Sequence, residues 1–209
     1  RDRSVSRGLG DVYKRQEQTR YQIYQDIYND SVWLNNLVEN LLYATRIEEG
    51  RMVLNTSTEL LADVIDDAVR HVKQHSGEHS IFVESDDEYI LVTADARLIV
   101  QVIINIVDNA VRYTPPGSHI TIRSCRENNM AVVYIEDNGN GISDEDKEHV
   151  FDKFYSGTNR IADNRRSIGL GLYLCKAIIE AHGGTITVRD NNPAGAVFVF
   201  TLPLADNAF

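Results

Sequence analysis

The chain has 209 residues, 43% of them hydrophobic and 25% charged, as expected of a soluble globular protein with one full domain and a smaller element. Its net charge of −10 excludes a general nucleic-acid or anionic-membrane surface, so any phosphate must be bound by local cations and backbone amides. The longest apolar stretch, residues 98–107, is too short to span a bilayer. Cys125 and Cys175 lack metal-ligand spacing and are expected to be buried thiols.

The first sixteen residues combine arginine with glycine and serine and have no sustained apolar periodicity. They resemble translated adapter sequence and are excluded from the predicted fold, with a genuine flexible leader as the alternative. Residues 17–49 contain no glycine or proline, and their apolar side chains recur at helical spacing, which predicts a long helix ending at Gly50. Such a helix requires a partner helix or a second subunit, unless it packs on the main domain.

Helices and strands alternate in the rest of the chain. The predicted elements are a helix at 58–72, strands at 80–84 and 89–93 around an Asp-Asp turn, a helix from Asp95 to about residue 113, antiparallel strands at 119–125 and 131–136, a short helix at 143–151, a helix at 169–182, and a strand pair at 185–188 and 196–202. Residues 156–167 are polar and aperiodic, which predicts a mobile loop. This mixture indicates an α+β two-layer sandwich.

Two asparagines, Asn105 and Asn109, stand four residues apart and therefore share one face of the predicted helix. Buried amides need polar partners, and amide oxygens suit Mg²⁺, which takes further ligands from phosphate and water. Arg112 follows and can reach a phosphate oxygen, while Asp108 on an adjacent face can polarise a group or accept a proton. A helix with buried amide caps is the alternative for this spacing alone.

Asp137 ends an apolar strand and precedes the turn Asn138-Gly139-Asn140-Gly141. A carboxylate there can accept a hydrogen bond from an exocyclic amine such as N6 of adenine, and the glycines let the backbone approach the base. Alone, this turn is more typical of a hairpin. Gly169-Leu170-Gly171 opens a helix whose amides favour phosphate, although it is a weak signal by itself. The three blocks in this order predict a Mg-nucleotide pocket.

The segments that carry these blocks resemble the N, G1, F and G2 boxes of sensor histidine kinases: they read NIVDNAVRYTPPG, EDNGNGI, FDKFYSG and SIGLGLYLCKAIIEAHGG. The resemblance covers about residue 51 to the end and implies the Bergerat fold of the GHKL ATPases, an α+β sandwich with a mixed, mostly antiparallel sheet. The segment NLVENLLYATRIEEG resembles the second helix of the family's dimerisation and phosphotransfer hairpin. DNRRSIGLGL and VWLNNLVENLL are most similar to Kdp-type potassium-responsive sensor kinases.

By this resemblance the chain binds ATP and Mg²⁺ and transfers the γ-phosphoryl group to a histidine of the hairpin. The residues implied to hold Mg²⁺ are Asn105 and Asn109, and those implied in catalysis are Asp108 and Asn105. The residues implied to bind the nucleotide are Asn109, Arg112, Tyr113, Asp137, Gly139, Gly141, Ile142, Arg160, Arg165, Gly169, Leu170, Gly171 and Leu172. Asp137 would recognise adenine, and Arg160 and Arg165 would reach the phosphates from an ATP lid whose base is packed by Phe151 and Phe154.

The resemblance divides the chain into a leader at 1–16, the second hairpin helix at 17–50 and an ATP-binding catalytic domain at 51–209. The family's phosphoacceptor histidine belongs to the first hairpin helix, and all six histidines of this chain follow residue 50, so the acceptor is expected to be absent. The implied partners are ATP or ADP, the hairpin of the same protein, a second copy in a homodimer and a response regulator. The domain would lie on the cytoplasmic side of a membrane-anchored bacterial sensor.

Two alternatives remain open. The first is a module that binds nucleotide and dimerises without catalysis of its own. The second is another GHKL ATPase, of the gyrase, chaperone or mismatch-repair type, which would need transducer segments for which this length leaves no room.

Overall fold

The computed structural model describes residues 19–205 except 22, 25, 26, 29, 32, 33, 36, 48, 52, 75, 86, 88, 156 and 158–168. It divides into two compact units, Arg1–Leu42 and Tyr43–Phe209. The predicted leader at 1–16 and most of the polar segment at 156–167 lie outside the described residues.

The described residues of the first unit are helical, as the sequence predicts, and the helical backbone continues to residue 47. Large apolar side chains on this helix remain exposed: Ile27, Leu34, Val38 and Leu41 keep between 48% and 56% of their surface accessible. Contiguous apolar surface of this kind is stabilised when another surface covers it. The need for a partner therefore stays a prediction that the exposure supports.

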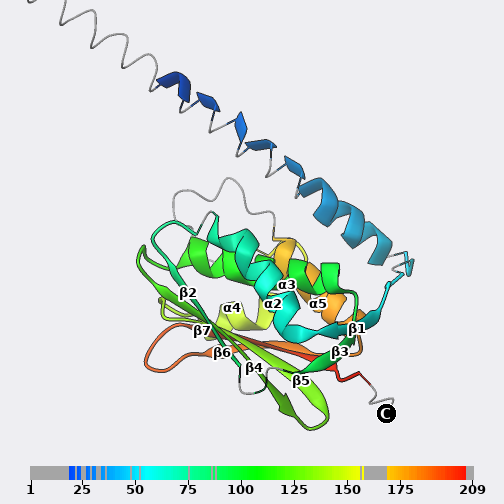
Figure 1. Cartoon of the computed structure of the whole chain (residues 1–209). Helices are drawn as coiled ribbons and strands as arrows, with labels where there is room; N and C mark the ends of the chain where they lie inside the picture. The colour runs from blue at the N-terminus through cyan, green and yellow to red at the C-terminus, as the bar shows by residue number, and fades with distance from the viewer. Residues whose placement is uncertain are drawn as a thin grey trace, which may run out of the picture. The chain divides into compact units, whose positions relative to one another are not determined.

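The second unit is built on a five-stranded sheet in the order β2-β4-β5-β7-β6 (Figure 1). Its strands are β2 (Ser80–Ser85), β4 (His119–Glu127), β5 (Met130–Asp137), β6 (Ile186–Asp190) and β7 (Ala196–Pro203). β2 runs parallel to β4, and the other neighbours are antiparallel. A separate small sheet pairs β1 (Ser57–Leu60) with β3 (Leu91–Ala94).

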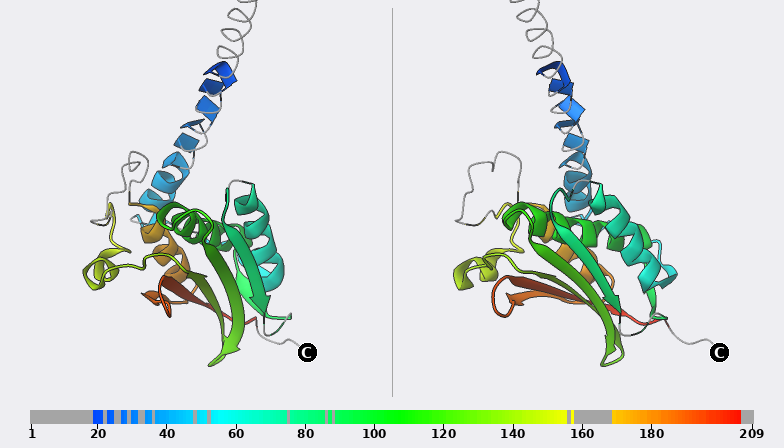
Figure 2. Two further views of the ribbon diagram at one scale, coloured as in Figure 1. Left: turned by 90° about the vertical axis from the view of Figure 1, so that its left-hand side faces the viewer. Right: turned by 60° about the vertical axis from the view of Figure 1, so that its left-hand side comes forward.

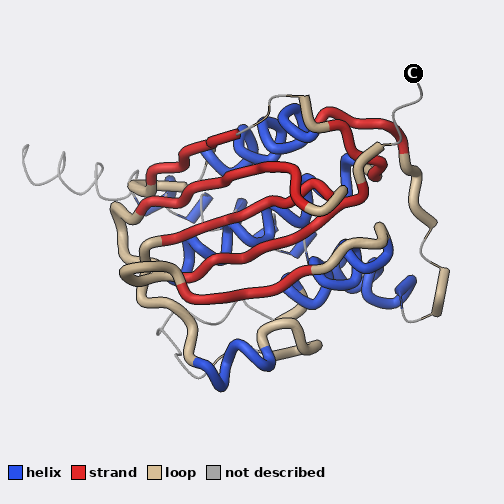
Figure 3. The backbone as a smooth tube through the Cα atoms, turned by 90° about the horizontal axis from the view of Figure 1, so that it is seen from below, coloured by secondary structure: helices blue, strands red, loops and turns tan. Residues whose placement is uncertain are grey.

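Helices cover one face of the five-stranded sheet and form a second layer (Figures 2 and 3). They are α2 (Leu61–Lys73), α3 (Ala96–Tyr113) and α5 (Gly171–Ala181), with α3 in contact with both α2 and α5. The short α4 (Asp144–His149) is tied to the end of β6, because Nζ of Lys147 lies 2.6 Å from Oδ2 of Asp190. The predicted α+β sandwich with a mixed, mostly antiparallel sheet is confirmed.

The hydrophobic core lies between the two layers. Alternate residues of β5 point toward the helices, and Ala131, Val133 and Ile135 are at most 1% exposed. The apolar residues of α3 recur at helical spacing and are 0–7% exposed: Leu98, Ile99, Val102, Ile103, Ile106, Val107 and Ala110. Burial of this face fixes the rotation of α3 about its axis, and so decides where its polar residues lie.

One predicted boundary was wrong. Thr58–Leu60 belongs to β1, and the helix begins only at Leu61. The strands predicted at 80–84 and 89–93 are present as β2 and β3, and they have different partners, because β2 pairs with β4 and β3 pairs with β1. Local patterns show that a strand forms, whereas its partner is chosen by packing against residues distant in sequence. Within the described ranges, no helix has both the length and the apolarity needed to cross a membrane.

Asp95 precedes α3 as predicted, but its side chain makes no capping hydrogen bond to that helix. Its carboxylate instead accepts from the backbone N–H of Asn55 at 3.1 Å, and its own N–H donates to Nε2 of His182 at 3.0 Å. Nδ1 of His182 lies 2.7 Å from the carbonyl oxygen of Ile178, so the imidazole hydrogen sits on Nδ1. Asp95 and His182 therefore join the segment before β1, the start of α3 and the end of α5.

We expect Ile103→Ala to lower the free energy of unfolding by about 2–5 kcal/mol, because Ile103 is fully buried in the core. Val53 is 88% exposed, so Val53→Ala is the matched control and should change stability by no more than about 0.5 kcal/mol. Denaturant unfolding followed by circular dichroism measures both variants. Equal losses of stability would contradict the position of Ile103 in the core.

Candidate functional site

Helix α3 carries the predicted polar residues along the edge that the core does not use. Asn105, Asp108 and Asn109 are half-buried there, and Arg112 is exposed. The spacing of four residues places the two amides on one face, as predicted. One helix therefore presents the amides, the acid and the cation together.

The amide of Asn105 has one satisfied end and one unsatisfied end. Its Oδ1 accepts a hydrogen bond from Nε2 of Gln101 at 3.1 Å. Among the described residues, its Nδ2 is the single buried side-chain nitrogen or oxygen without a hydrogen-bond partner. A buried unpaired donor costs roughly 1–3 kcal/mol. An acceptor that reaches this atom from a ligand is therefore favoured.

The donor set on α3 suits Mg²⁺ rather than a transition metal. The described residues contain no group of three or more His, Cys, Asp or Glu that could hold a metal ion. Two amides completed by phosphate and water oxygens give the hard, oxygen-rich set that Mg²⁺ takes. Oδ1 of Asn105 is engaged by Gln101, so a metal bond there uses its second lone pair or requires a half-turn of the amide. With that condition, Asn105 and Asn109 fit the ion.

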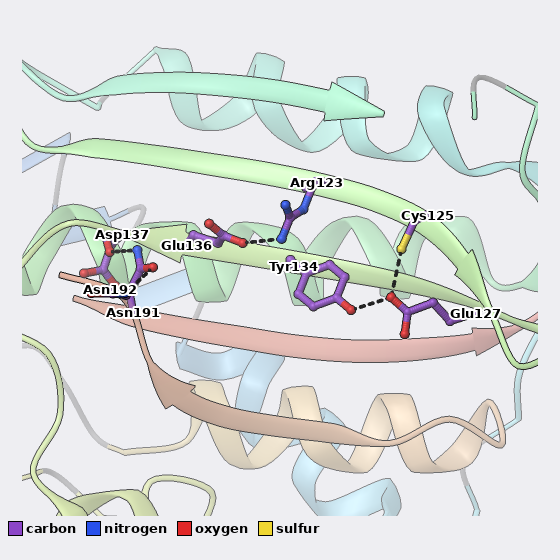
Figure 4. Close-up of polar contacts among 8 residues, drawn as sticks. All are labelled: Arg123, Cys125, Glu127, Tyr134, Glu136, Asp137, Asn191 and Asn192. Atoms are coloured by element: carbon purple, nitrogen blue, oxygen red, sulfur yellow. Dashed lines mark hydrogen bonds and ion pairs between the residues drawn. The ribbon is translucent and has the colours of Figure 1, made fainter. Parts of the chain in front are cut away.

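Asp137 lies at the end of β5 (Figure 4). Its residue surface is only 8% exposed. Its Oδ1 accepts from the backbone N–H of Gly139 at 2.9 Å and from that of Ala196 at 3.3 Å. Burial raises the pKa of the Asp137 carboxyl above its ordinary value, and these two N–H groups act in the opposite direction. Because both donors reach the same oxygen, Oδ2 is left to accept from a ligand.

The two glycines after Asp137 lie so close to neighbouring residues that a side chain at either position would collide with them. A Cβ on Gly139 would lie 2.4 Å from Cγ2 of Thr114 and 3.0 Å from Oδ1 of Asp137. Gly141 has a φ of +74°, and a Cβ there would lie 3.1 Å from the carbonyl oxygen of Gly195. The turn therefore exposes backbone rather than side chains beside the carboxylate.

The Gly169-Leu170-Gly171 block shapes the start of α5. Gly169 has a φ of +70°, and a Cβ there would lie 2.4 Å from the carbonyl oxygen of Tyr155. The N–H of Phe154 donates to the carbonyl oxygen of Gly169 at 2.9 Å. Leu170 is the buried N-cap, and Gly171 is the first residue of the helix. The first-turn amides of α5 lack partners within the helix, which favours an anion at this end.

The structure brings the Asp-Gly and Gly-Leu-Gly blocks to the helix that carries the asparagines. A Cβ on Gly171 would be in ordinary contact, at 3.9 Å, with Cγ of Asn105. Gly139 packs on Thr114, the residue directly after α3. Tyr113, the last residue of α3, is 38% exposed. Ile142 and Leu172 are partly buried against the core. Their roles toward a nucleotide stay predictions.

The residues before the polar segment are held in place, whereas Arg160 and Arg165 lie outside the described residues. The hydroxyl of Tyr155 donates to Oδ1 of Asp146 at 2.6 Å, which raises the pKa of Tyr155 to about 12. Phe151 packs edge-on against Phe198, with ring centroids 6.3 Å apart. Phe154 is 57% exposed, so of the two phenylalanines expected to pack here only Phe151 joins the core.

Burial raises the pKa of the Cys175 thiol to about 12, so the thiol is protonated and inert at neutral pH. Its Sγ lies 3.7 Å from the carbonyl oxygen of Val102 on α3. Cys125 is half-buried rather than buried, and its Sγ donates to Oε1 of Glu127 at 3.3 Å. Neither cysteine is in a disulfide.

The turn between β6 and β7 supplies site residues that the sequence does not single out. Nδ2 of Asn191 donates to the carbonyl oxygen of Asp137 at 2.8 Å. Gly195 lies so close that a Cβ on it would be 1.9 Å from the same oxygen. Asn191-Asn192-Pro193-Ala194-Gly195 is a recognisable turn signal. No feature of that signal indicates which distant residue the turn contacts.

The chain matches the family described as histidine kinase-, DNA gyrase B-, and HSP90-like ATPases over residues 94–206. That range contains α3, Asp137 and α5. The chain belongs to this family. Within this ATPase family, its fold is that of histidine kinase catalytic domains.

The proteins that this chain matches include a curated sensor protein and solved structures of histidine kinases. The chain is 38% identical to the sensor protein KdpD of Clostridium acetobutylicum over 90% of this chain and 21% of that protein, and so spans about a fifth of it. It is 29% identical to the catalytic domain of histidine kinase ThkA, with a TM-score of 0.61 over 71% of this chain and 96% of that one. ThkA in complex with the response regulator protein TrrA matches at 28% identity and a TM-score of 0.65, over 84% and 50% of the two chains. The Acinetobacter baumannii histidine kinase AdeS matches at 26% identity and a TM-score of 0.70, over 88% of this chain and 84% of that one.

We expect Asp137→Asn to stabilise the nucleotide-free protein at neutral pH. Because burial raises the folded-state pKa of Asp137, ionisation of this carboxyl favours the unfolded chain as the pH rises. Asparagine keeps an oxygen for Gly139 and Ala196 and removes the charge. The gain in Tm should be smallest toward pH 4, where the carboxyl is least ionised in the folded and unfolded states, and largest at neutral pH.

Thermal unfolding between pH 4 and 8 without nucleotide measures this difference. Asp144→Asn is the control, because the Asp144 side chain is 98% exposed and Lys147 lowers its pKa, so that removing its charge gives no gain at neutral pH. A gain for Asp137→Asn that shrinks as the pH rises would contradict the burial of an ionised carboxyl.

Proposed function

We propose that this chain is the ATP-binding catalytic domain of a two-component sensor histidine kinase and transfers the γ-phosphoryl group of Mg-ATP to a histidine. The observation that carries the proposal is the buried Asp137 carboxylate, held at one oxygen by Gly139 and Ala196. A purine site needs a fixed acceptor beside bare backbone, and Gly139 supplies that backbone. The sensor-kinase relatives support the same function.

Adenine is the base that this carboxylate selects. Oδ2 of Asp137 accepts a hydrogen bond from the exocyclic amine at C6, whereas guanine carries a carbonyl oxygen at that position and would be repelled. A site built around one buried polar group discriminates strongly, because the wrong partner leaves that group unpaired. Tyr113, at the end of α3, is assigned to the wall of the base site.

The phosphates are assigned to the start of α5 and to Arg112. Unpaired amides and the positive end of the helix dipole attract anions, and a chain with a net charge of −10 depends on such local groups. Arg160 and Arg165 are proposed as further cations. Mg²⁺, when bound through Asn105 and Asn109, neutralises charge on the phosphates.

Phosphoryl transfer depends mainly on positioning and charge stabilisation. Asp108, next to Asn109 on α3, is the acid that we assign to the accepting imidazole, whose positive charge and orientation a carboxylate stabilises. The six histidines of the chain all follow residue 50, so the acceptor is proposed to lie on a separate hairpin helix. The helix at 19–47 is proposed as its mate in a homodimer, which the exposed apolar side chains support.

The signalling context is also a proposal. The ThkA–TrrA complex supports a response regulator as the partner that receives the phosphoryl group. We further propose, from the resemblance of its sequence blocks to sensor histidine kinases, that the domain lies on the cytoplasmic side of a membrane-anchored sensor.

We expect Asp137→Asn to weaken ADP binding by about 10- to 100-fold, because it removes a charge-assisted hydrogen bond in a buried site. Calorimetric titration with ADP and a non-hydrolysable ATP analogue, with and without Mg²⁺, measures the loss. Asp144→Asn makes the same change of charge on exposed α4 and should bind as the wild type does. Binding that survives in Asp137→Asn would remove the base site from this position.

We expect Asp108→Asn to slow transfer from radiolabelled ATP to a separately supplied hairpin domain by about 10- to 100-fold, with ADP affinity unchanged. The control is Asp66→Asn, which changes an exposed acid on α2. Transfer at the wild-type rate in Asp108→Asn would refute the role of this acid.

The same assays separate the two alternatives. Nucleotide binding without transfer to any supplied hairpin would favour a binding and dimerisation module. Steady-state ATP hydrolysis that depends on Asp108, without a hairpin present, would favour another type of GHKL ATPase.

A further inference from the structure

We propose that Asn191 is a positioning residue for base recognition, because its side chain frees a backbone amide to hold the Asp137 carboxylate. The proposal rests on the function proposed above, in which that carboxylate accepts from the base. Asn191 follows β6 and is 54 residues from Asp137 in sequence, yet the two lie side by side (Figure 4).

The register of the sheet shows what Asn191 replaces. The last pair of the antiparallel β5–β7 ladder is Glu136 with Val197, so the register places Ala196 opposite Asp137. In a regular ladder the N–H of Ala196 would donate to the carbonyl oxygen of Asp137. Here it donates to the side-chain Oδ1 at 3.3 Å, and Nδ2 of Asn191 takes the carbonyl oxygen at 2.8 Å. The asparagine side chain stands in for the ladder donor.

The exchange is needed because Asp137 is buried. A carbonyl group in this position that lost its ladder donor without replacement would be destabilising. With Asn191 in place, both the carbonyl oxygen and Oδ1 have donors. Oδ1 keeps two of them, from Gly139 and Ala196, and these fix the direction in which Oδ2 points.

The turn holds Asn191 at both ends of its side chain. Oδ1 of Asn191 accepts from the N–H of Asn192 at 2.9 Å, while Nδ2 donates to Asp137. The backbone N–H of Asn191 donates to the carbonyl oxygen of Gly195 at 3.0 Å, which closes the turn. Gly195 has no Cβ, which would otherwise lie 1.9 Å from the Asp137 carbonyl oxygen. The side chain is therefore already oriented before any ligand arrives.

Without the Nδ2 donor, the N–H of Ala196 is the group that can return to the Asp137 carbonyl oxygen. The carboxylate then keeps only the N–H of Gly139 and can rotate. A base that depends on a fixed acceptor binds less tightly, and the preference for an amine over a carbonyl at C6 falls. A purely structural role would lower the affinity for all nucleotides alike.

The test compares Asn191→Asp with Asn192→Asp in the full chain. Asn191→Asp keeps the acceptor for the N–H of Asn192 and replaces only the donor. Asn192→Asp adds the same charge at the adjacent, exposed residue and keeps the Asn191 side chain intact. Asn191→Leu removes the donor without adding charge. Calorimetry gives the Kd for ADP and for GDP, and thermal unfolding shows that each variant is folded.

We expect both Asn191 variants to bind ADP about tenfold more weakly, with a similar fall in the ratio of ADP to GDP affinity, and Asn192→Asp to match the wild type. The proposal is overturned if Asn191→Asp equals Asn192→Asp, if only the charged Asn191 variant loses affinity, or if ADP and GDP weaken equally. Failure of the underlying function looks different: the wild type would then bind no ADP, or Asp137→Asn would bind it unchanged.

Discussion

The buried carboxyl group of Asp137 is the constraint around which this end of the domain is built. Desolvation disfavours its charged form, so donors must be brought to it, and Gly139 and Ala196 bring theirs from two different segments. Such close approach leaves no room for side chains at Gly139 or Gly195. The end of α3, the end of β5 and the β6–β7 turn therefore meet around one carboxylate.

Two unfavourable features lie on the parts of the fold assigned to nucleotide. Asp137 keeps a carboxyl group whose burial raises its pKa, and Asn105 keeps a buried amide nitrogen without a partner. The opposite face of α3 shows no such conflict, since Ile99, Val102 and Ile103 are fully buried in the core. The apolar side of α3 thus contributes the core packing that stabilises the fold. The buried amide nitrogen on its other side is a group to which a ligand can supply a hydrogen-bond acceptor.

The sequence was most informative where a local pattern has one structural meaning. The apolar period of α3 predicted that helix, and the Gly-Leu-Gly block predicted the start of α5. The order of the three blocks predicted a shared nucleotide pocket, which stays a prediction. The pattern before Leu61 was misjudged as helical, and the partner of β2 was not predicted, because propensity does not specify a distant strand. The contact of Asn191 with Asp137 could not be predicted for the same reason, because it depends on a strand register that only the folded sheet defines.

Helices α3 and α5 are fixed against each other near both ends of α5. At its start, Gly171 lies next to Asn105, since a Cβ on Gly171 would be 3.9 Å from Cγ of Asn105. Beyond its end, Nε2 of His182 accepts from the backbone N–H of Asp95. The packed core between these points prevents one helix from sliding along the other. Because the carboxylate of Asp95 also accepts from Asn55, the segment that leads into β1 is bonded to this pair. The segment before β1, the start of α3 and the end of α5 are therefore held by one connected set of hydrogen bonds, which fixes the ends of the two helices that carry the asparagines and the Gly-Leu-Gly block.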